Sequence, residues 1–257
     1  IICIADNVVP HEKRFGDHAF TKYFIKPVDA FITMSEKVLT DLRSFTQTKP
    51  AVLQPHPLYD VFGNAVSKQD ARAHLGINQD SFIFLFFGFI RKYKGLDMLL
   101  EAFAQLRKLQ IANCKLMIAG EFYEDRKLYD ELIEQLCIKE DLILKTEFIA
   151  DSEVKYYLCA SDAVVQPYRN ATQSGVTPLA YHFEIPMIVT NVGGLPAFVP
   201  HGKVGLVCEP TVDSIAAAME QYMQTGSEQF LPQLREEKKK YGWDKMTAAV
   251  LQLAASV

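Results

Sequence analysis

Short apolar runs alternate with longer stretches of helical periodicity along almost the whole chain, and this alternation restricts the fold more than any other feature. The apolar runs predict nine β-strands, at 1–5, 30–34, 51–54, 82–87, 115–119, 142–148, 163–166, 187–190 and 205–208. Between them, apolar side chains recur every three or four residues, which predicts amphipathic helices over segments such as 96–106 and 213–224. Strands that are apolar along their whole length and alternate with helices indicate a parallel sheet covered on both faces, so we predict the α/β class.

The composition excludes several functional classes. The chain has 257 residues, of which 49% are hydrophobic, so it has enough apolar material for one large domain or two. A formal net charge of −4 without a concentrated basic face argues against nucleic-acid binding. The longest uncharged runs contain polar residues and fall short of the ~18 apolar residues of a membrane span. We expect the five cysteines, which form no CxxC pair, to be buried thiols of a reducing compartment: Cys3, Cys114, Cys137, Cys159 and Cys208.

A segment with two prolines, followed by polar residues, divides the chain into two strand–helix blocks, and we place this linker at 56–81. The block at 82–235 contains enough strand–helix units for a complete doubly wound domain. The block at 1–55 contains about three strands and two helices, and a piece of roughly 60 residues buries little surface. We therefore expect 1–55 to be the C-terminal portion of a Rossmann-like domain whose first part is absent from this chain.

A basic loop follows the strand predicted at 82–87 and leads into the next helix; it reads Gly88-Phe89-Ile90-Arg91-Lys92-Tyr93-Lys94-Gly95. In a parallel sheet its three cations lie at the carboxyl edge, where such sheets bind ligands. Backbone N–H groups and the positive end of a helix favour an anion there. The loop is neither a P-loop nor a GxGxxG fingerprint, which excludes those two modes of nucleotide binding. A solvated basic loop is the alternative.

A second polar loop, 167–176, follows the strand predicted at 163–166 and leads into a helix expected from about 175 to 183. We expect four backbone N–H groups to surround a phosphate here, those of Ser174, Gly175, Val176 and Thr177. An ordinary N-cap is the alternative role for Ser174. Farther along, Gly193-Gly194 predicts a tight turn whose backbone faces the same crevice, or a turn with a purely structural role.

No motif for nucleophilic or metal-dependent catalysis is present. The sequence contains no GxSxG, no HExxH and no Asp-rich loop with metal-ligand spacing. We therefore predict no metal site.

Two longer segments carry a family resemblance when they are taken together: the basic loop with the following helix (87–103), and Pro-Met-Ile-Val-Thr-Asn-Val-Gly-Gly-Leu-Pro (186–196). The same order of shorter segments continues around them, at 29–36, 119–121, 161–168, 205–207 and 242–245. As a set these segments resemble glycosyltransferase family 4, over nearly the whole chain.

The resemblance implies a GT-B fold, with two Rossmann-like domains facing each other across a cleft and a C-terminal helix, here 236–257, that crosses back to the first domain. It implies a retaining, metal-independent hexosyltransferase that uses a nucleotide-diphosphate-sugar as donor and no other cofactor. Arg91 and Lys94 would be catalytic, because fixed cations stabilise the charge that grows on the diphosphate as its bond to the sugar breaks. The resemblance assigns donor binding to Gly88, Glu121, Gln173, Ser174, Gly175, Val176 and Thr177.

The chain departs from the family pattern in the loop that should bind the donor. Many members carry two glutamates eight positions apart, and the matching positions are Thr172 and Ala180, or one residue earlier if Pro186 is the anchor. Neither position is acidic in either alignment. Donor recognition must therefore differ, and Gln173 and Ser174 are the candidates for it.

Two further departures concern catalysis. Many relatives have a histidine near the acceptor, whereas this chain has Asp6 at that place and His11 a little farther on. We take Asp6 as the third catalytic candidate, with a turn-capping aspartate as the alternative. The arginine of the basic loop also lies nearer the lysine, three positions away, than in many relatives.

Three functions are compatible with these features. The first is a transferase that moves a sugar onto a glycan or glycolipid in polysaccharide biosynthesis. Such an enzyme would be cytoplasmic, and a lipid-linked acceptor would bring it into peripheral contact with the inner membrane face. The basic residues of the chain, however, predict no amphipathic membrane anchor. The second is a donor-binding fragment or degenerate, non-catalytic subunit. The third is another GT-B enzyme such as a nucleotide-sugar epimerase, but the acids and histidines that this chemistry needs are not found.

Overall fold

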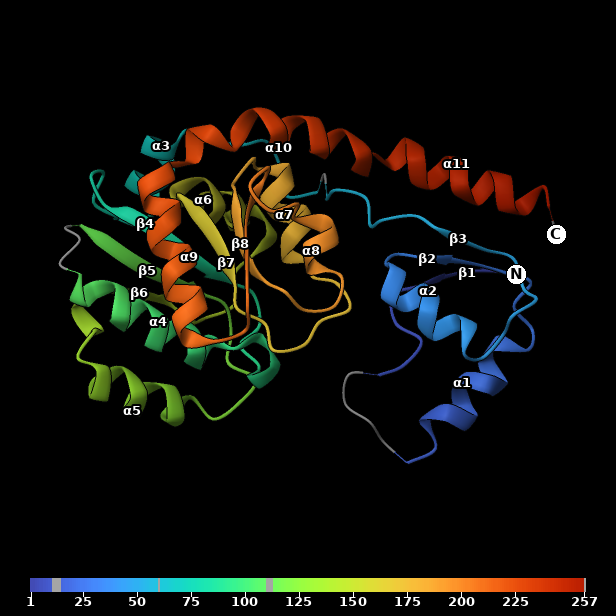
Figure 1. Ribbon diagram of the computed structural model, residues 1–257. Helices are drawn as coiled ribbons and strands as arrows, with labels where there is room; N and C mark the ends of the chain where they lie inside the picture. The colour runs from blue at the N-terminus through green and yellow to red at the C-terminus, as the bar shows by residue number, and fades with distance from the viewer. Residues whose placement is uncertain (11–14, 60, 110–112, 257) are drawn as a thin grey trace.

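The computed structural model describes residues 1–10, 15–59, 61–109 and 113–256, and within these ranges it contains two parallel β-sheets (Figure 1). The first sheet has the order β1-β2-β3, with β1 (Ile2–Ala5), β2 (Ala30–Thr33) and β3 (Ala51–Leu53). The second has the order β6-β5-β4-β7-β8-β9, with β4 (Phe82–Phe87), β5 (Cys114–Ala119), β6 (Leu142–Lys145), β7 (Ala163–Gln166), β8 (Met187–Thr190) and β9 (Gly205–Cys208). The predicted α/β class and the nine predicted strand positions are confirmed. Only the strand expected at 142–148 is clearly shorter, because its partner β5 ends at Ala119, opposite Lys145.

The second sheet is covered on both faces, and β4 shows why its sequence is apolar throughout. Successive side chains of a strand point to opposite faces. Phe84 and Phe86 pack on the side of α4 (Leu96–Lys108), α5 (Arg126–Leu136) and α9 (Val212–Thr225). Ile83 and Leu85 pack on the opposite side, which is covered by α3 (Lys68–Leu75), α6 (Asp151–Ala160), α7 (Val176–His182), α8 (Leu195–Phe198) and α10 (Leu231–Lys238). These four side chains are at most 1% exposed, and each such burial stabilises the fold by about 1.5–3 kcal/mol.

The first sheet has its two faces covered by helices from opposite ends of the chain. On one face, Phe31 of β2 packs with Ile25 of α1 (Asp17–Ile25) and Leu42 of α2 (Glu36–Arg43). On the other, its neighbour Ile32 packs with Met246 of α11 (Trp243–Ala254). Figure 1 shows α11 extending from the second sheet across to the first, so that the N- and C-termini lie at the same end of the molecule.

The chain passes between the two sheets twice, after β3 and before α11, and the two passages are hydrogen bonded to each other. The backbone N–H of Leu58 donates to the carbonyl oxygen of Tyr241 at 2.9 Å. The indole N–H of Trp243 donates to the carbonyl oxygen of Leu58, also at 2.9 Å. The precise domain boundaries, 1–55, 56–81, 82–235 and 236–257, stay predictions.

The cysteines differ from the expectation at two positions. Cys114, Cys159 and Cys208 are buried, and burial raises the pKa of Cys114 and of Cys208 to about 12, which makes these thiols unreactive. Cys3 is only partly buried, and Cys137 is exposed because it caps the C-terminus of α5 in the left-handed conformation, with φ at 55°. The expectation of buried thiols is therefore wrong for Cys137.

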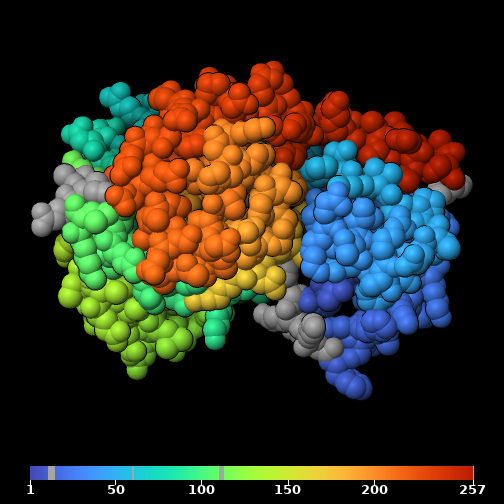
Figure 2. Space-filling model, viewed as in Figure 1, coloured from blue at the N-terminus to red at the C-terminus, as the bar shows by residue number. Residues whose placement is uncertain are grey.

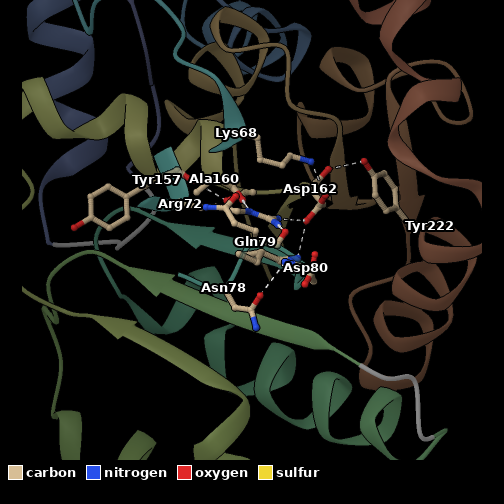
Figure 3. Close-up of polar contacts among 11 residues, drawn as sticks. Lys68, Arg72, Asn78, Gln79, Asp80, Tyr157, Ala160, Asp162 and Tyr222 are labelled. Carbon is tan, nitrogen blue, oxygen red and sulfur yellow. Dashed lines mark hydrogen bonds and ion pairs between the residues drawn. The ribbon is translucent and has the colours of Figure 1, made fainter. Parts of the chain in front are cut away.

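A buried ion pair joins distant segments on the second sheet, beside the beginning of β7 (Figure 3). Asp162, which precedes β7, accepts from the Arg72 guanidinium at 2.9 Å and from the backbone N–H of Ile83 at 2.7 Å. The side chain of Arg72 is 4% exposed and that of Asp162 is 13% exposed. Lys68 also donates to Asp162, at 2.7 Å, but from a side chain that is 45% exposed. The hydroxyl of Tyr222 donates to the carbonyl oxygen of Asp162, which adds α9 to the cluster.

The ion pairs that Asp162 forms with Arg72 and with Lys68 should contribute very differently to the free energy of unfolding. We predict that Asp162→Asn lowers the free energy of unfolding by about 3 kcal/mol or more, because it leaves the buried Arg72 charge uncompensated. Lys68→Ala should lower it by less than about 1 kcal/mol, because an exposed ion pair is screened by water. Urea titration of both variants measures these changes, and equal losses for the two variants would contradict the assignment.

Candidate active site

The loops that follow β4, β5, β7 and β8 meet at the carboxyl edge of the second sheet, and close backbone contacts hold them together. Gly120, after β5, has φ at 137°, and a Cβ added to it would lie 2.3 Å from the carbonyl oxygen of Gly88, after β4. Gly193, after β8, has φ at 53°, and its Cβ would lie 1.4 Å from the carbonyl oxygen of Ala171. Only glycine permits these approaches. The predicted turn at Gly193-Gly194 therefore does face the loop after β7.

Lys94 lies where the loop after β4 meets the beginning of α7. The position that a Cβ of residue 88 would occupy, if Gly88 had one, marks this meeting point. The ammonium nitrogen of Lys94 lies 3.3 Å from that position, and a methyl carbon of Val176 lies 3.7 Å from it. The nitrogen also lies 5.6 Å from the ring centroid of the buried Tyr168. Burial, and secondarily the charge of Arg91, lower the pKa of Lys94 to about 8. Among the described residues, no carboxylate lies within 4.0 Å of this nitrogen to compensate its charge.

The other two cations of the basic loop have different surroundings. Arg91 is partly buried, and its guanidinium carbon lies 5.0 Å from the ring centroid of Tyr123. Lys92 has an exposed side chain, and its backbone N–H donates to the carboxylate of Glu124. The structure therefore places Arg91 near Lys94, whereas Lys92 is surface.

An ion pair that the sequence did not suggest fixes the basic loop to the loop after β7. Both terminal nitrogens of Arg169 donate to the carboxylate of Asp97, at 2.6 and 2.8 Å. Arg169 also donates to the carbonyl oxygen of Lys92 at 3.1 Å, and its backbone N–H donates to the carbonyl oxygen of Tyr93 at 2.7 Å. Because the arginine is held at four points, it positions the loop that carries Lys94. The partners lie 72 residues apart in sequence, so no local signal could have paired them.

Of the four N–H groups expected to surround a phosphate, two already donate to acceptors within the protein. The N–H of Val176 donates to the Ser174 hydroxyl at 3.2 Å, and that of Thr177 donates to the Ser174 carbonyl at 3.3 Å. Ser174 is thus a local cap, and its hydroxyl also shares a hydrogen bond with Tyr168 at 3.1 Å. In the described part of the chain, the N–H groups of Ser174 and Gly175 alone among the four have no protein acceptor. α7 has only seven residues, so its own end contributes little to anion binding.

The two positions where relatives carry glutamates are structural here. Ala180 is fully buried in the core that covers the second sheet. Thr172 is 6% exposed, and its hydroxyl donates to the side-chain oxygen of Asn7 at 2.6 Å. Neither can supply a carboxylate to a ligand.

The loop after β1 meets the loop after β7, so the carboxyl edges of the two sheets face each other. The amide nitrogen of Gln173 donates to Asp6 at 2.9 Å, beside the Asn7–Thr172 contact. In the space-filling view, the yellow-to-orange part of the second unit lies against the blue first unit, below the red C-terminal helix (Figure 2). The structure thus brings Asp6 and Gln173 together, whereas His11 lies outside the described residues.

Glu121 follows Gly120 at the same edge, where its carbonyl oxygen accepts from the N–H of Ile90 at 2.8 Å. The N–H of Gly120 donates to the carbonyl oxygen of Lys145 at 3.0 Å, which brings the end of β6 alongside. A hollow of about 310 Å³ opens there, lined by residues 144–149 and Tyr157. Of its lining residues, Lys145 is linked to the basic loop, through Gly120 and then Gly88.

Residues 1–10, 15–59, 61–109 and 113–256 contain no group of three or more His, Cys, Asp or Glu side chains placed to hold a metal ion. In the same ranges, no helix has the length and apolar character to cross a bilayer.

Two parallel α/β units with facing carboxyl edges, joined by a linker and by a helix that crosses back, define the GT-B fold. The family model of glycosyl transferases group 1 matches residues 67–242, and the chain belongs to this family. HepE of Anabaena, solved in complex with UDP, has a TM-score of 0.85 at 15% identity, over 100% of this chain and 72% of that one. WaaG, a glycosyltransferase involved in lipopolysaccharide biosynthesis, has a TM-score of 0.75 at 19% identity, over 93% of this chain and 69% of that one.

Curated relatives match a shorter part of their own length. A D-inositol 3-phosphate glycosyltransferase of Catenulispora acidiphila is 31% identical over 150 residues, which are 55% of this chain and 35% of the relative. An uncharacterized glycosyltransferase of Methanocaldococcus jannaschii is 27% identical over 203 residues, 76% of this chain and 51% of the relative. The chain therefore spans between about a third and a half of these relatives.

The environment of Lys94 should be visible in its titration. We predict that the ammonium group of Lys94 loses its proton with a midpoint near pH 8, because burial disfavours the charged form. NMR of the protein with isotopically methylated lysines measures this, and the resonance is assigned by its absence from Lys94→Met. A Lys94 signal that does not move between pH 7 and 9 would contradict the described burial.

Proposed function

We propose that this chain is the donor-binding part of a glycosyltransferase that moves a hexosyl group from a nucleotide-diphosphate-sugar to a glycan or lipid-linked acceptor. The observation that carries the proposal is Lys94, a half-buried cation without an acidic partner among the described residues, at the carboxyl edge of the second sheet. Burying a charge without a partner is unfavourable. A diphosphate in this place would compensate it.

The surroundings of Lys94 accommodate the rest of a diphosphate. Arg91 brings a second cation, whose charge already acts on Lys94. The N–H groups of Ser174 and Gly175 supply donors, and Gly88 leaves room for a ligand beside the ammonium group. We assign the hollow at 144–149 to the nucleobase, because Lys145 connects it through Gly120 to this loop and its mainly polar lining offers hydrogen-bonding groups beside Phe148 and Tyr157.

The sugar would then lie toward Asp6 and Gln173, between the two sheets. When the bond from the anomeric carbon to the phosphate oxygen breaks, the electron pair stays on the diphosphate. Lys94 and Arg91 would stabilise this added charge without a metal ion, as preplaced cations do in other sites of this kind. We propose that the anomeric configuration is retained, as the resemblance to glycosyltransferase family 4 implies.

Relatives and solved neighbours support the donor class. HepE of Anabaena was also solved with UDP-glucose, and this structure has a TM-score of 0.83 at 15% identity. The identity is low, so the base and sugar used by this chain are proposals, which we test with UDP- and GDP-sugars side by side.

We propose peripheral contact with the inner membrane face on the acceptor side. Three aromatic side chains of α1 are exposed, Phe20, Tyr23 and Phe24, beside the exposed Lys22 and Lys26. Aromatic and basic residues together favour the interface of an anionic membrane. This arrangement supports a lipid-linked acceptor.

A second candidate function is a donor-binding subunit without turnover. It is favoured by the burial of Ala180 and by the use of Thr172 for an interdomain hydrogen bond, since neither position retains a carboxylate for the donor. Calorimetry with UDP- and GDP-sugars, followed by assays of transfer and of donor hydrolysis, separates the two functions. Binding without either reaction would identify the subunit, and no binding of any nucleotide sugar would overturn both proposals.

Lys94→Ala should weaken binding of the nucleoside diphosphate by about 1–3 kcal/mol, the scale of a charge-assisted contact. Lys92→Ala is the matched control, because this lysine belongs to the same loop but its side chain is exposed. We expect the control to change the binding free energy by less than about 0.5 kcal/mol, as is usual for exposed charges. Equal effects of the two substitutions, measured by calorimetry, would argue that the loop only provides general positive charge.

Donor affinity should fall as the pH rises above about 8, the value to which the pKa of Lys94 is lowered. Below this pH the ammonium group is charged before the donor binds, so affinity is constant; above it, binding must also take up a proton. The dissociation constant of the nucleotide sugar should therefore increase by up to about tenfold per pH unit between pH 8 and 9.5. In Lys94→Arg, whose side chain keeps its proton, the dissociation constant should stay flat. A flat profile in the unmodified chain would contradict this role.

A further inference from the structure

Gln173 has one side-chain atom whose hydrogen-bonding capacity is unused. Its amide nitrogen donates to Asp6 at 2.9 Å, which fixes the orientation of the carboxamide. The other atom, Oε1, is buried and has no hydrogen-bond partner among the described residues. A buried acceptor without a donor is unfavourable, and it therefore marks a place that a ligand donor would fill.

Asp6 adds a negative charge to the same place. It is exposed, and within the described ranges no Lys or Arg forms an ion pair with it. Its charge acts on Tyr59, whose pKa is raised by burial and then by Asp6. The Tyr59 hydroxyl would lie 3.3 Å from a Cβ on Gly175, so the field of Asp6 extends to the loop that precedes α7.

Open space lies on one side of Asp6. A cavity of about 500 Å³ along β1 and α1 is lined by Asp6 and Asn7 together with Phe20, Phe24 and Phe31, all of the first unit. Gln173 and Gly175 belong to the loop that approaches Lys94 through Val176. The loop at 173–176 reaches Asp6 at one end and the surroundings of Lys94 at the other, so the sugar of a ligand held at Lys94 by its diphosphate would lie toward Asp6 and Gln173.

We propose that Asp6 and Gln173 determine which sugar the donor carries: they accept a neutral sugar through a hydroxyl group and exclude sugars that carry a carboxylate. This inference rests on the proposed function and specifies the substrate class of the same site. Gln173 Oε1 and the Asp6 carboxylate are both acceptors, so a ligand group that contacts either of them must be a donor such as a hydroxyl. A uronate would place a second negative charge beside Asp6, and specificity of this kind comes from the repulsive contact as much as from the attractive one.

The experiment compares two donors with the same nucleotide, UDP-glucose and UDP-glucuronate, with free UDP as reference; if GDP binds in place of UDP, GDP-mannose and GDP-mannuronate replace them. Calorimetry on the full chain should show the neutral donor binding at least tenfold more tightly than the uronate. In Asp6→Asn, which keeps the shape of the side chain and removes its charge, the ratio should shrink by tenfold or more while the affinity for the free nucleoside diphosphate stays constant.

Gln173→Leu provides an independent variant. It should weaken binding of the neutral sugar donor at least fivefold and leave the free nucleoside diphosphate unaffected, because the substitution removes the Oε1 acceptor for the sugar, together with the hydrogen bond from Nε2 to Asp6. Glu131→Gln is the matched control, since it removes an exposed carboxylate on α5. It should change neither the ratio of the two donor affinities nor the affinity for the neutral donor.

Two results would overturn the inference and can be told apart. If the nucleoside diphosphate binds but the uronate binds as well as the neutral donor, or Asp6→Asn leaves their ratio unchanged, this inference fails and the proposed function stands. If neither nucleoside diphosphate binds, the proposed function fails and this inference fails with it.

Discussion

A parallel sheet must have both of its faces covered, and most of this structure follows from that requirement. The second sheet meets it with helices that lie between its own strands and just after them in sequence. Among the described residues, the helices near the first sheet in sequence are α1 and α2, and both pack on the same face. Its other face is covered by α11, the last helix of the chain, through contacts such as Ile32 with Met246. The C-terminal helix thus returns to the first sheet, and the two connections between the sheets lie next to each other.

The same constraint explains what could be predicted from the sequence. Strands buried on both faces are apolar at every position, so residues such as 82–87 indicate both their secondary structure and their burial. The glycines at 193–194 indicated a tight turn at a strand end, and the structure shows the carbonyl oxygen that Gly193 approaches. The packing of α11 on the first sheet has no local signal, and only the family resemblance suggested it.

What the sequence could not predict are contacts between residues far apart in the chain. Arg169 and Asp97, or Asp162 and Arg72, are pairs whose partners are separated by dozens of residues, and each alone reads as a surface charge. Likewise, a run of small polar residues before α7 suggests free N–H groups. Whether Ser174 already occupies those of Val176 and Thr177 depends on local geometry that the composition does not specify. The lowered pKa of Lys94 likewise arises from burial by loops that are distant in sequence.

The hydrogen bonds of Leu58 with Tyr241 and Trp243 tie the two connections between the sheets into one pivot. A displacement of one connection along the other would break these hydrogen bonds. Across the cleft, the described side-chain hydrogen bonds are few, with Asn7–Thr172 and Asp6–Gln173 among them. The two units are therefore joined in two different ways: by backbone and indole hydrogen bonds where the chain passes between the sheets, and by side-chain hydrogen bonds at the facing carboxyl edges.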